Sequence, residues 1–230
     1  NWPYGGKPEQ HGSLRGGRQV FVTMTMPEHL LVGGTDRLDL NIAALNSHDG
    51  CSAFRLLLTP VRVVCANTQA AALRNHAATV SIRHTTGARS AVSAARDALG
   101  LTFAYAAEFQ TQADQLIEQD LTDAAFADLV RATFPTPPRD SPGRARDLAR
   151  RRWQTLSQLF HDADTQDGIR GTAWAGYQAV VEYVDHYAPV RTTTSDVATA
   201  RASRLLTSAT PTRIKHTAWA TLTGTHPPNR

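Results

Sequence analysis

The residues best suited to chemistry lie in a short polar segment between two apolar runs, Asn46-Ser47-His48-Asp49-Gly50. His48 could act as a general base that the Asp49 carboxylate orients, or both side chains could hold a metal ion. His84 is the third member of this candidate catalytic set. A metal-dependent nuclease or other hydrolase would require these three side chains to converge from separate loops.

The same segment also suits a tight turn. Asn46 and Asp49 can hydrogen-bond to their own backbone, and an Asp-Gly pair tolerates positive φ. Turn chemistry accounts for every residue type in the segment, so it is the favoured interpretation. The structural turn residues are then Asn46, Ser47, Asp49 and Gly50.

The common cofactor and metal motifs are missing from the sequence. It contains no HExxH, CxxC or DxD motif, no phosphate-binding glycine loop and no G-x-S-x-G segment. The two cysteines, Cys51 and Cys65, lie in apolar runs typical of buried free thiols. We therefore predict no cofactor and no metal site, and the balance favours a protein that is not an enzyme.

Arginines provide the second set of candidates. Arg55, Arg62, Arg74 and Arg83 fall in or beside a region rich in strands. If Arg55 and Arg62 lie on one face of a sheet, the set would form a strip that binds nucleic-acid backbone, since guanidinium groups contact phosphates bidentately. The alternative is a solvated face, or ion pairs with Asp36, Asp39 and Asp49.

Charge is unevenly distributed along the 230 residues, whose formal net charge is +4. Residues 101–130 carry six acidic and no basic residues, whereas 131–160 carry seven arginines and two aspartates. Five of those arginines lie within 144–152. On a helix this run would be either a solvated face or a DNA-contacting surface.

The elements that position these residues begin with short β-rich runs. We expect strands over 18–26, closed by Pro27, then over 30–32, 38–45, 54–59, 61–64 and 80–84. A short helix over 69–75 would be capped by Asn67-Thr68. Because strands come first and helices after, the fold class is α+β, an N-terminal antiparallel β meander with a short helix followed by a mostly helical C-terminal half.

Helices are expected over 88–99, 102–119, 122–134 and 144–160, followed by one capped by Thr172 and two more over 194–207 and 212–222. Thr122 is the expected N-cap of the third of these. The domain boundaries that follow are an irregular segment over 1–16, an α+β domain over 17–134, a Pro-rich linker over 135–143 and a helical region over 144–230. The chain starts at Asn1 without Met, which suggests a piece of a longer protein.

Three stretches resemble the family called domain of unknown function 932, a phage- and plasmid-borne group. They are 14–22, the block 45–68 that contains "LNSHDG" and "TPVRVVC", and 81–85. The helix over 173–186 is similar to the C-terminal part of that family, so the resemblance covers residues 14 to about 222. It implies a bacterial host, hence a cytoplasmic location, and a gene near replication and recombination genes.

The leading hypothesis is a phage- or plasmid-type DNA-binding protein, a single-strand annealing or recombination accessory factor. The expected partner is nucleic acid, with single-stranded DNA favoured, and no membrane. Annealing proteins tend to form rings, so a homo-oligomer is one option. The alternatives are the nuclease described above and a structural or host-interaction protein that exposes Trp174, Tyr177 and Val181.

Overall fold

The computed structural model describes residues 7–14, 17–47, 54–62, 67–68, 79–82, 106–138, 140–190, 197, 200–201, 204–205 and 208–224. Over 7–14, 54–62, 67–68 and 79–82 it describes the backbone pairing alone. The chain divides into two compact units. The first comprises residues 1–32 and 37–111, and the second comprises residues 33–36 and 112–230.

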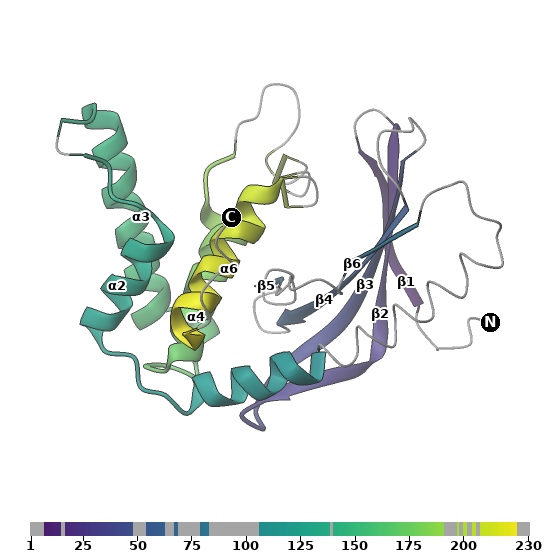
Figure 1. Cartoon of the computed structure of the whole chain (residues 1–230), viewed down its shortest axis with the longest axis horizontal. Coiled ribbons are helices and arrows are strands. Elements are labelled where there is room, and N and C mark those ends of the chain that lie inside the picture. The colour runs from purple at the N-terminus through teal and green to yellow at the C-terminus, as the bar shows by residue number, and fades with distance from the viewer. Residues whose placement is uncertain are drawn as a thin grey trace. The chain divides into compact units, whose positions relative to one another are not determined.

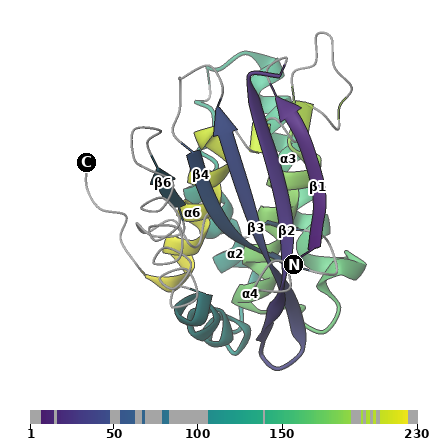
Figure 2. The ribbon, with the colours of Figure 1, turned by 90° about the vertical axis from the view of Figure 1, so that its right-hand side faces the viewer.

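The first unit contains a six-stranded sheet with the path β1-β2-β3-β4-β5, and β6 pairs with β4 beside that path. Figure 2 shows β1 to β4 side by side. The strands are Lys7–Leu14 (β1), Gln19–Val32 (β2), Asp36–Ser47 (β3), Phe54–Arg62 (β4), Asn67–Thr68 (β5) and Thr79–Ile82 (β6). The pairs β1–β2, β3–β4, β4–β5 and β4–β6 are antiparallel. Strands followed by helices confirm the predicted α+β class (Figure 1).

Two prolines lie inside strands that were expected to end at them. The expected break at Pro27 is wrong, because β2 continues through it to Val32. Among the described residues, Thr25 is the last residue of β2 that pairs with β1, and Pro27 lies beyond it. Pro60 lies in β4 between the residues paired with β6 and those paired with β5, and it is opposite Leu40 of β3.

The N-terminal segment over 1–16 is not irregular throughout, as its composition suggested. Residues Lys7–Leu14 form β1 and pair with Gln19–Thr25 of β2. Pairing with the neighbouring strand β2 provides backbone hydrogen bonds for this segment. These hydrogen bonds outweigh the low strand propensity of residues such as Gly and Gln.

The two faces of the β2–β3 pair differ in polarity. Side chains at even-numbered positions are buried and apolar, namely Leu30, Val32, Leu38, Leu40 and Ile42. Several odd-numbered positions are polar, namely Thr23, Thr25, His29, Asp39 and Asn41, and the Thr25 hydroxyl donates to Asn41 Oδ1 at 2.6 Å. The strands expected over 38–45 and 80–84 correspond to β3 and β6 of this sheet.

The second unit is helical and is built around a buried central helix. Its elements after residue 112 are the end of a helix over 106–117, then α2 (Asp123–Thr133), α3 (Gly143–His161), the 3-10 turn η1 (Asp164–Gln166), α4 (Ala173–Glu182), the π-helix η2 (Tyr183–Tyr187) and α6 (Ala209–Thr223). Every residue of α4 is buried, and α2, α3 and α6 all contact it. A mostly apolar helix that is buried on all sides is typical of such a central position.

The expected helix starts are found. Thr122 Oγ1 accepts from Ala125 N at 3.3 Å at the start of α2, and Thr172 Oγ1 accepts from Ala175 N at 3.1 Å at the start of α4. The apolar side chains expected on one face of α2 are all buried, namely Phe126, Leu129, Val130 and Phe134.

The Pro-rich segment over 135–143 connects α2 to α3, two helices of the same compact unit. The change from the first unit to the second comes instead between residues 111 and 112, inside a helix. The tip of the β2–β3 hairpin, Gly33–Asp36, also belongs to the second unit. Its Gly33 N–H donates to Asp114 Oδ1 at 2.8 Å.

Candidate nucleic-acid interface

Most of the candidate residues from the sequence lie outside the part of the chain that the structure describes. This holds for the catalytic set His48, Asp49 and His84, for the turn residue Gly50, for both cysteines, and for Arg74 and Arg83. Their assignments stay predictions. Asn46 and Ser47, the first two residues of the expected turn, instead form the end of β3. The described residues contain no group of three or more His, Cys, Asp or Glu side chains that could hold a metal ion.

Arg55 and Arg62 both lie in β4, and the backbone register gives their positions. Arg55 pairs with Leu45, and Arg62 pairs with Leu38, without a bulge between them. Arg62 is seven positions after Arg55, and successive positions of a strand belong to opposite faces. Arg62 therefore shares the face of the buried Leu38, so one strip on a single face cannot include both arginines.

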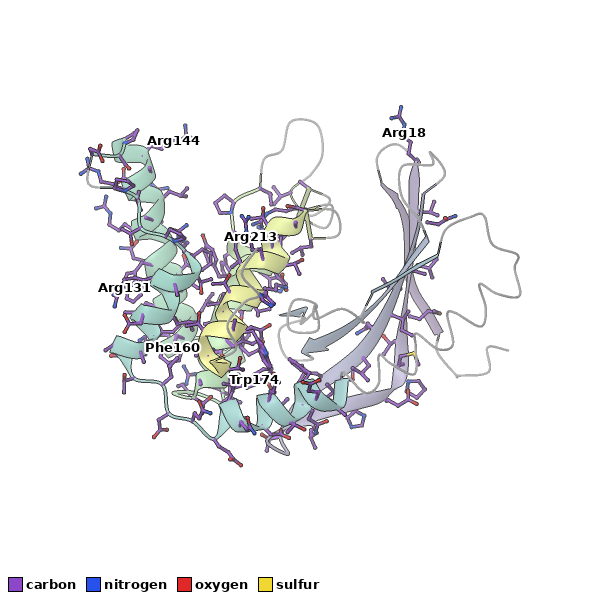
Figure 3. All side chains as sticks on the ribbon, viewed as in Figure 1. Arg18, Arg131, Arg144, Phe160, Trp174 and Arg213 are labelled. Atoms are coloured by element: carbon purple, nitrogen blue, oxygen red, sulfur yellow. The ribbon has the colours of Figure 1, made fainter. Side chains whose placement is uncertain are left out.

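The first half of α3 is the most basic exposed surface among the described residues. The three buried residues of this 19-residue helix, Leu156, Leu159 and Phe160, all lie in its second half. The turns before them carry the exposed arginines Arg144, Arg146, Arg150 and Arg151. Figure 3 shows Arg144 at the free end of α3, with Phe160 further along among the other helices.

Two interactions reduce the number of free charges on this helix. Arg150 forms an exposed ion pair with Asp147, one turn earlier. Arg152 is half-buried, and its guanidinium carbon lies 4.8 Å from the centre of the Phe134 ring. An exposed ion pair contributes little to stability, so Arg150 can exchange Asp147 for another anion, whereas Arg152 is held by packing.

Trp153 and Leu148 are exposed apolar side chains on the same stretch. The exposed fractions are 40% for Trp153 and 49% for Leu148. The indole of Trp153 contacts the buried Phe126 ring, with centroids 6.2 Å apart, and Phe126 in turn stacks on Phe160 at 4.2 Å. Trp153 therefore lies at the edge of an aromatic cluster and keeps a large surface open to solvent.

A buried ion pair lies elsewhere in the helical unit. Lys215 Nζ of α6 lies 2.6 Å from Asp185 Oδ1 and donates to Asp185 Oδ2 at 2.8 Å, and both side chains are almost inaccessible to water. Burial lowers the pKa of the Lys215 ammonium, although the Asp185 carboxylate opposes that shift. Burial, and secondly Asp185, raise the pKa of the Tyr177 hydroxyl. This pair links α6 to η2, the π-helix that follows α4.

The sequence hypothesis of an exposed stripe on α4 is resolved by burial. Trp174, Tyr177 and Val181 are each 0% exposed. The exposed stripe that a host-interaction surface would need on this helix is therefore not present.

Two features of the site could not be read from local sequence. The apolar spacing of α3 suggests that Trp153 faces inward with Leu156 and Phe160, yet it lies at the edge of that face. The three arginines directly before it, residues 150–152, are the signal that could have indicated an exposed position. Lys215, which lies 30 residues from Asp185, leaves no local signal for their pairing.

The fold and the surface of α3 define an α+β protein with a basic, solvent-exposed helix. A family model described as a domain of unknown function (DUF932) matches residues 4–206. The chain belongs to this family. No curated protein and no solved structure matched the chain. Within the described residues, none of the helices has the length and apolar composition needed to cross a membrane.

Proposed function

We propose that the protein binds DNA without acting on it chemically, as a phage- or plasmid-borne accessory factor in recombination or strand annealing. The observation that carries this proposal is the exposed first half of α3. Four arginines, Arg144, Arg146, Arg150 and Arg151, lie on a stretch of helix that buries none of its side chains.

The geometry of this stretch suits a phosphate backbone. Arg144 and Arg151 are seven residues apart, which is roughly 10 Å along a helix, so the four guanidinium groups are concentrated within two turns. Each can contact phosphate bidentately, and Asp147 is the one acidic residue among them. Because packing does not hold these four side chains, they are free to contact a ligand.

The arginines expected from the sequence take a smaller part in this proposal. Arg55, whose position in β4 pairs with Leu45 of β3, remains a candidate contact, as do Arg74 and Arg83. Arg62, at a position on the buried face, is not retained.

The test is fluorescence anisotropy of the full chain with labelled DNA of about 30 nucleotides over a salt series. A variant with Arg144, Arg146, Arg150 and Arg151 all changed to Ala should bind at least roughly tenfold more weakly. The slope of log affinity against log salt concentration should become less steep by about 3, because fewer counterions are released when the phosphate contacts are lost.

The matched control changes four exposed arginines outside α3 to Ala, namely Arg18, Arg37, Arg131 and Arg213. Both variants lower the formal net charge from +4 to 0, since 4 − 4 = 0. The control should keep its affinity to within about threefold. Equal losses in both variants would mean a non-specific charge effect, and no binding by the unmodified protein at low salt would contradict the proposal itself.

A further inference from the structure

We infer that α3 selects single-stranded over double-stranded nucleic acid, with Trp153 as the stacking platform for an unpaired base. This inference rests on the nucleic-acid binding proposed above and names the form of nucleic acid that the surface recognises. It follows from the placement of an exposed indole in line with two arginines.

Arg146, Arg150 and Trp153 follow one another at spacings of four and three residues. Residues at this spacing lie on one face of a helix, so the three side chains form a single line along α3. The line is roughly 10 Å long, from 1.5 Å of rise per residue. It places two phosphate-binding groups beside one aromatic ring.

The indole packs against a buried ring and is 40% exposed. Phe126, which is 1% exposed, lies against it at 6.2 Å with a tilt of 38° between the rings. The stacking of Phe126 on Phe160 at 4.2 Å anchors that ring in turn. A base that stacks on the open side of Trp153 therefore meets a ring that is already ordered, and little conformational entropy is lost on binding.

Single strands gain from this platform and duplexes do not. In a duplex the base faces are covered by their neighbours, so the arginines contact the backbone but the indole meets no base. In a single strand the faces are available, and stacking on an aromatic side chain strengthens binding by roughly 5- to 100-fold per base. Guanidinium groups next to the ring add backbone contacts without sequence preference.

The opposite flank of α3 provides an internal comparison. Leu148 lies at the corresponding spacing from Arg144 and Arg151, four residues after the first and three before the second. That flank has the same number of arginines and an apolar side chain of similar exposure, but no ring. If only charge and apolar contact contributed to binding, the two flanks would contribute equally to DNA affinity. A difference in affinity between variants of the two flanks therefore measures the contribution of stacking.

The experiment compares Trp153→Leu, Trp153→Phe and Leu148→Ala in the full chain, using an oligo-deoxythymidine strand of about 30 nucleotides and a duplex of equal length. Trp153→Leu should weaken single-strand binding by roughly 5- to 100-fold and leave duplex binding unchanged, while Trp153→Phe keeps most of the affinity. Leu148→Ala should change neither. Circular dichroism melting of each variant checks that the helix is intact.

Intrinsic fluorescence gives a second readout, which would not change on DNA binding if Trp153 served only to pack the helices. The chain has four tryptophans, and Trp2 is changed to Phe in every protein used for this measurement. Trp174 and Trp219 are buried, at 0% and 5% exposure, so quenching by a stacked base should then come from Trp153. Single strands should quench the emission of the Trp2→Phe protein, and adding Trp153→Phe should abolish that quenching.

The outcomes separate the two proposals. If DNA binds with full dependence on the α3 arginines but equally as single strand and duplex, without quenching, DNA binding stands and the stacking inference is overturned. If the unmodified protein binds no DNA, both the proposed function and the stacking inference are overturned. Binding of anionic phosphatidylserine vesicles that depends on Trp153, in the absence of a preference for single strands, would identify a membrane surface instead and also overturn the inference.

Discussion

Lys215 and Asp185 illustrate how burial changes the value of a single interaction. Both charges are held out of water, with 3% and 1% of their side chains exposed, so each depends on the other for compensation. Arg131 and Asp128 form the opposite case, an ion pair on the surface with 62% and 71% exposed. Because water already solvates the surface pair, its loss changes little.

We therefore expect Lys215→Met to lower the free energy of unfolding by about 3–5 kcal/mol, since it leaves a buried carboxylate without its partner. The double variant Lys215→Met with Asp185→Leu should recover most of that loss, because no uncompensated charge remains. Urea unfolding at pH 7, followed by circular dichroism, measures both. Arg131→Met is the control, with an expected change of less than about 1 kcal/mol. If Lys215→Met lowers the free energy of unfolding as little as Arg131→Met does, the buried pair is not the stabilising interaction described above.

At the scale of elements, the helix starts are where local sequence carries most information. Thr172 satisfies two groups at the start of α4, since its hydroxyl accepts from Ala175 N and donates to Ile169 O at 2.7 Å. The cap residue, the apolar pattern after it and the glycine before it are all within a few residues. Local rules of this kind predicted Thr122 and Thr172 as caps, and the structure confirms both.

Thr172→Ala should lower the free energy of unfolding by about 1–2 kcal/mol, because the N–H group of a buried helix loses its acceptor. Thr111→Ala provides the comparison. The Thr111 hydroxyl donates to the Ala107 carbonyl within a helix, where that carbonyl already has a helical partner and Ala is the better helix former. The control variant should therefore be neutral or slightly more stable in the same urea titration. Equal effects at the two positions would argue against a capping role for Thr172.

The strands show which features local sequence rules do not predict. Pro27 and Pro60 indicate strand ends by their lack of an N–H group, yet both lie inside strands of the sheet, β2 and β4. Whether a neighbour is present depends on residues far away in the sequence. The same limit applies to Arg62, whose face follows from its register with Leu38 rather than from its own neighbours.

At the scale of the whole molecule, the order of strands and helices was enough to predict the α+β class, but not the division into units. The helical unit includes Gly33–Asp36, which are separated from the rest of it by some seventy-five residues of the other unit. A boundary placed in the Pro-rich segment over 135–143 follows composition, whereas the units follow packing. Packing between distant segments, such as the hairpin tip and α4, has no local signature.

The contact between this hairpin tip and α4 provides the last prediction. Trp174 Nε1 donates to Asp36 Oδ2 at 2.7 Å, with both residues buried at 0% and 5% exposure. Asp36→Ala removes the acceptor and should lower the free energy of unfolding by about 1–3 kcal/mol, because a buried indole N–H loses a charge-assisted hydrogen bond. Asp36→Asn, which keeps an acceptor oxygen, should cost less.

The readout is urea unfolding followed by tryptophan emission, since the environment of Trp174 changes with this bond. Asp39→Ala is the matched control on the same strand. Asp39 forms an ion pair with Arg37 at 2.8 Å, and both side chains are partly exposed, so its loss should cost less than about 1 kcal/mol. If the two alanine variants unfold alike, the hairpin tip contributes no more to the helical unit than a surface residue does. If Asp36→Ala alone is destabilised, residues 33–36 are an integral part of that unit, and any fragment meant to fold as the helical unit must include them.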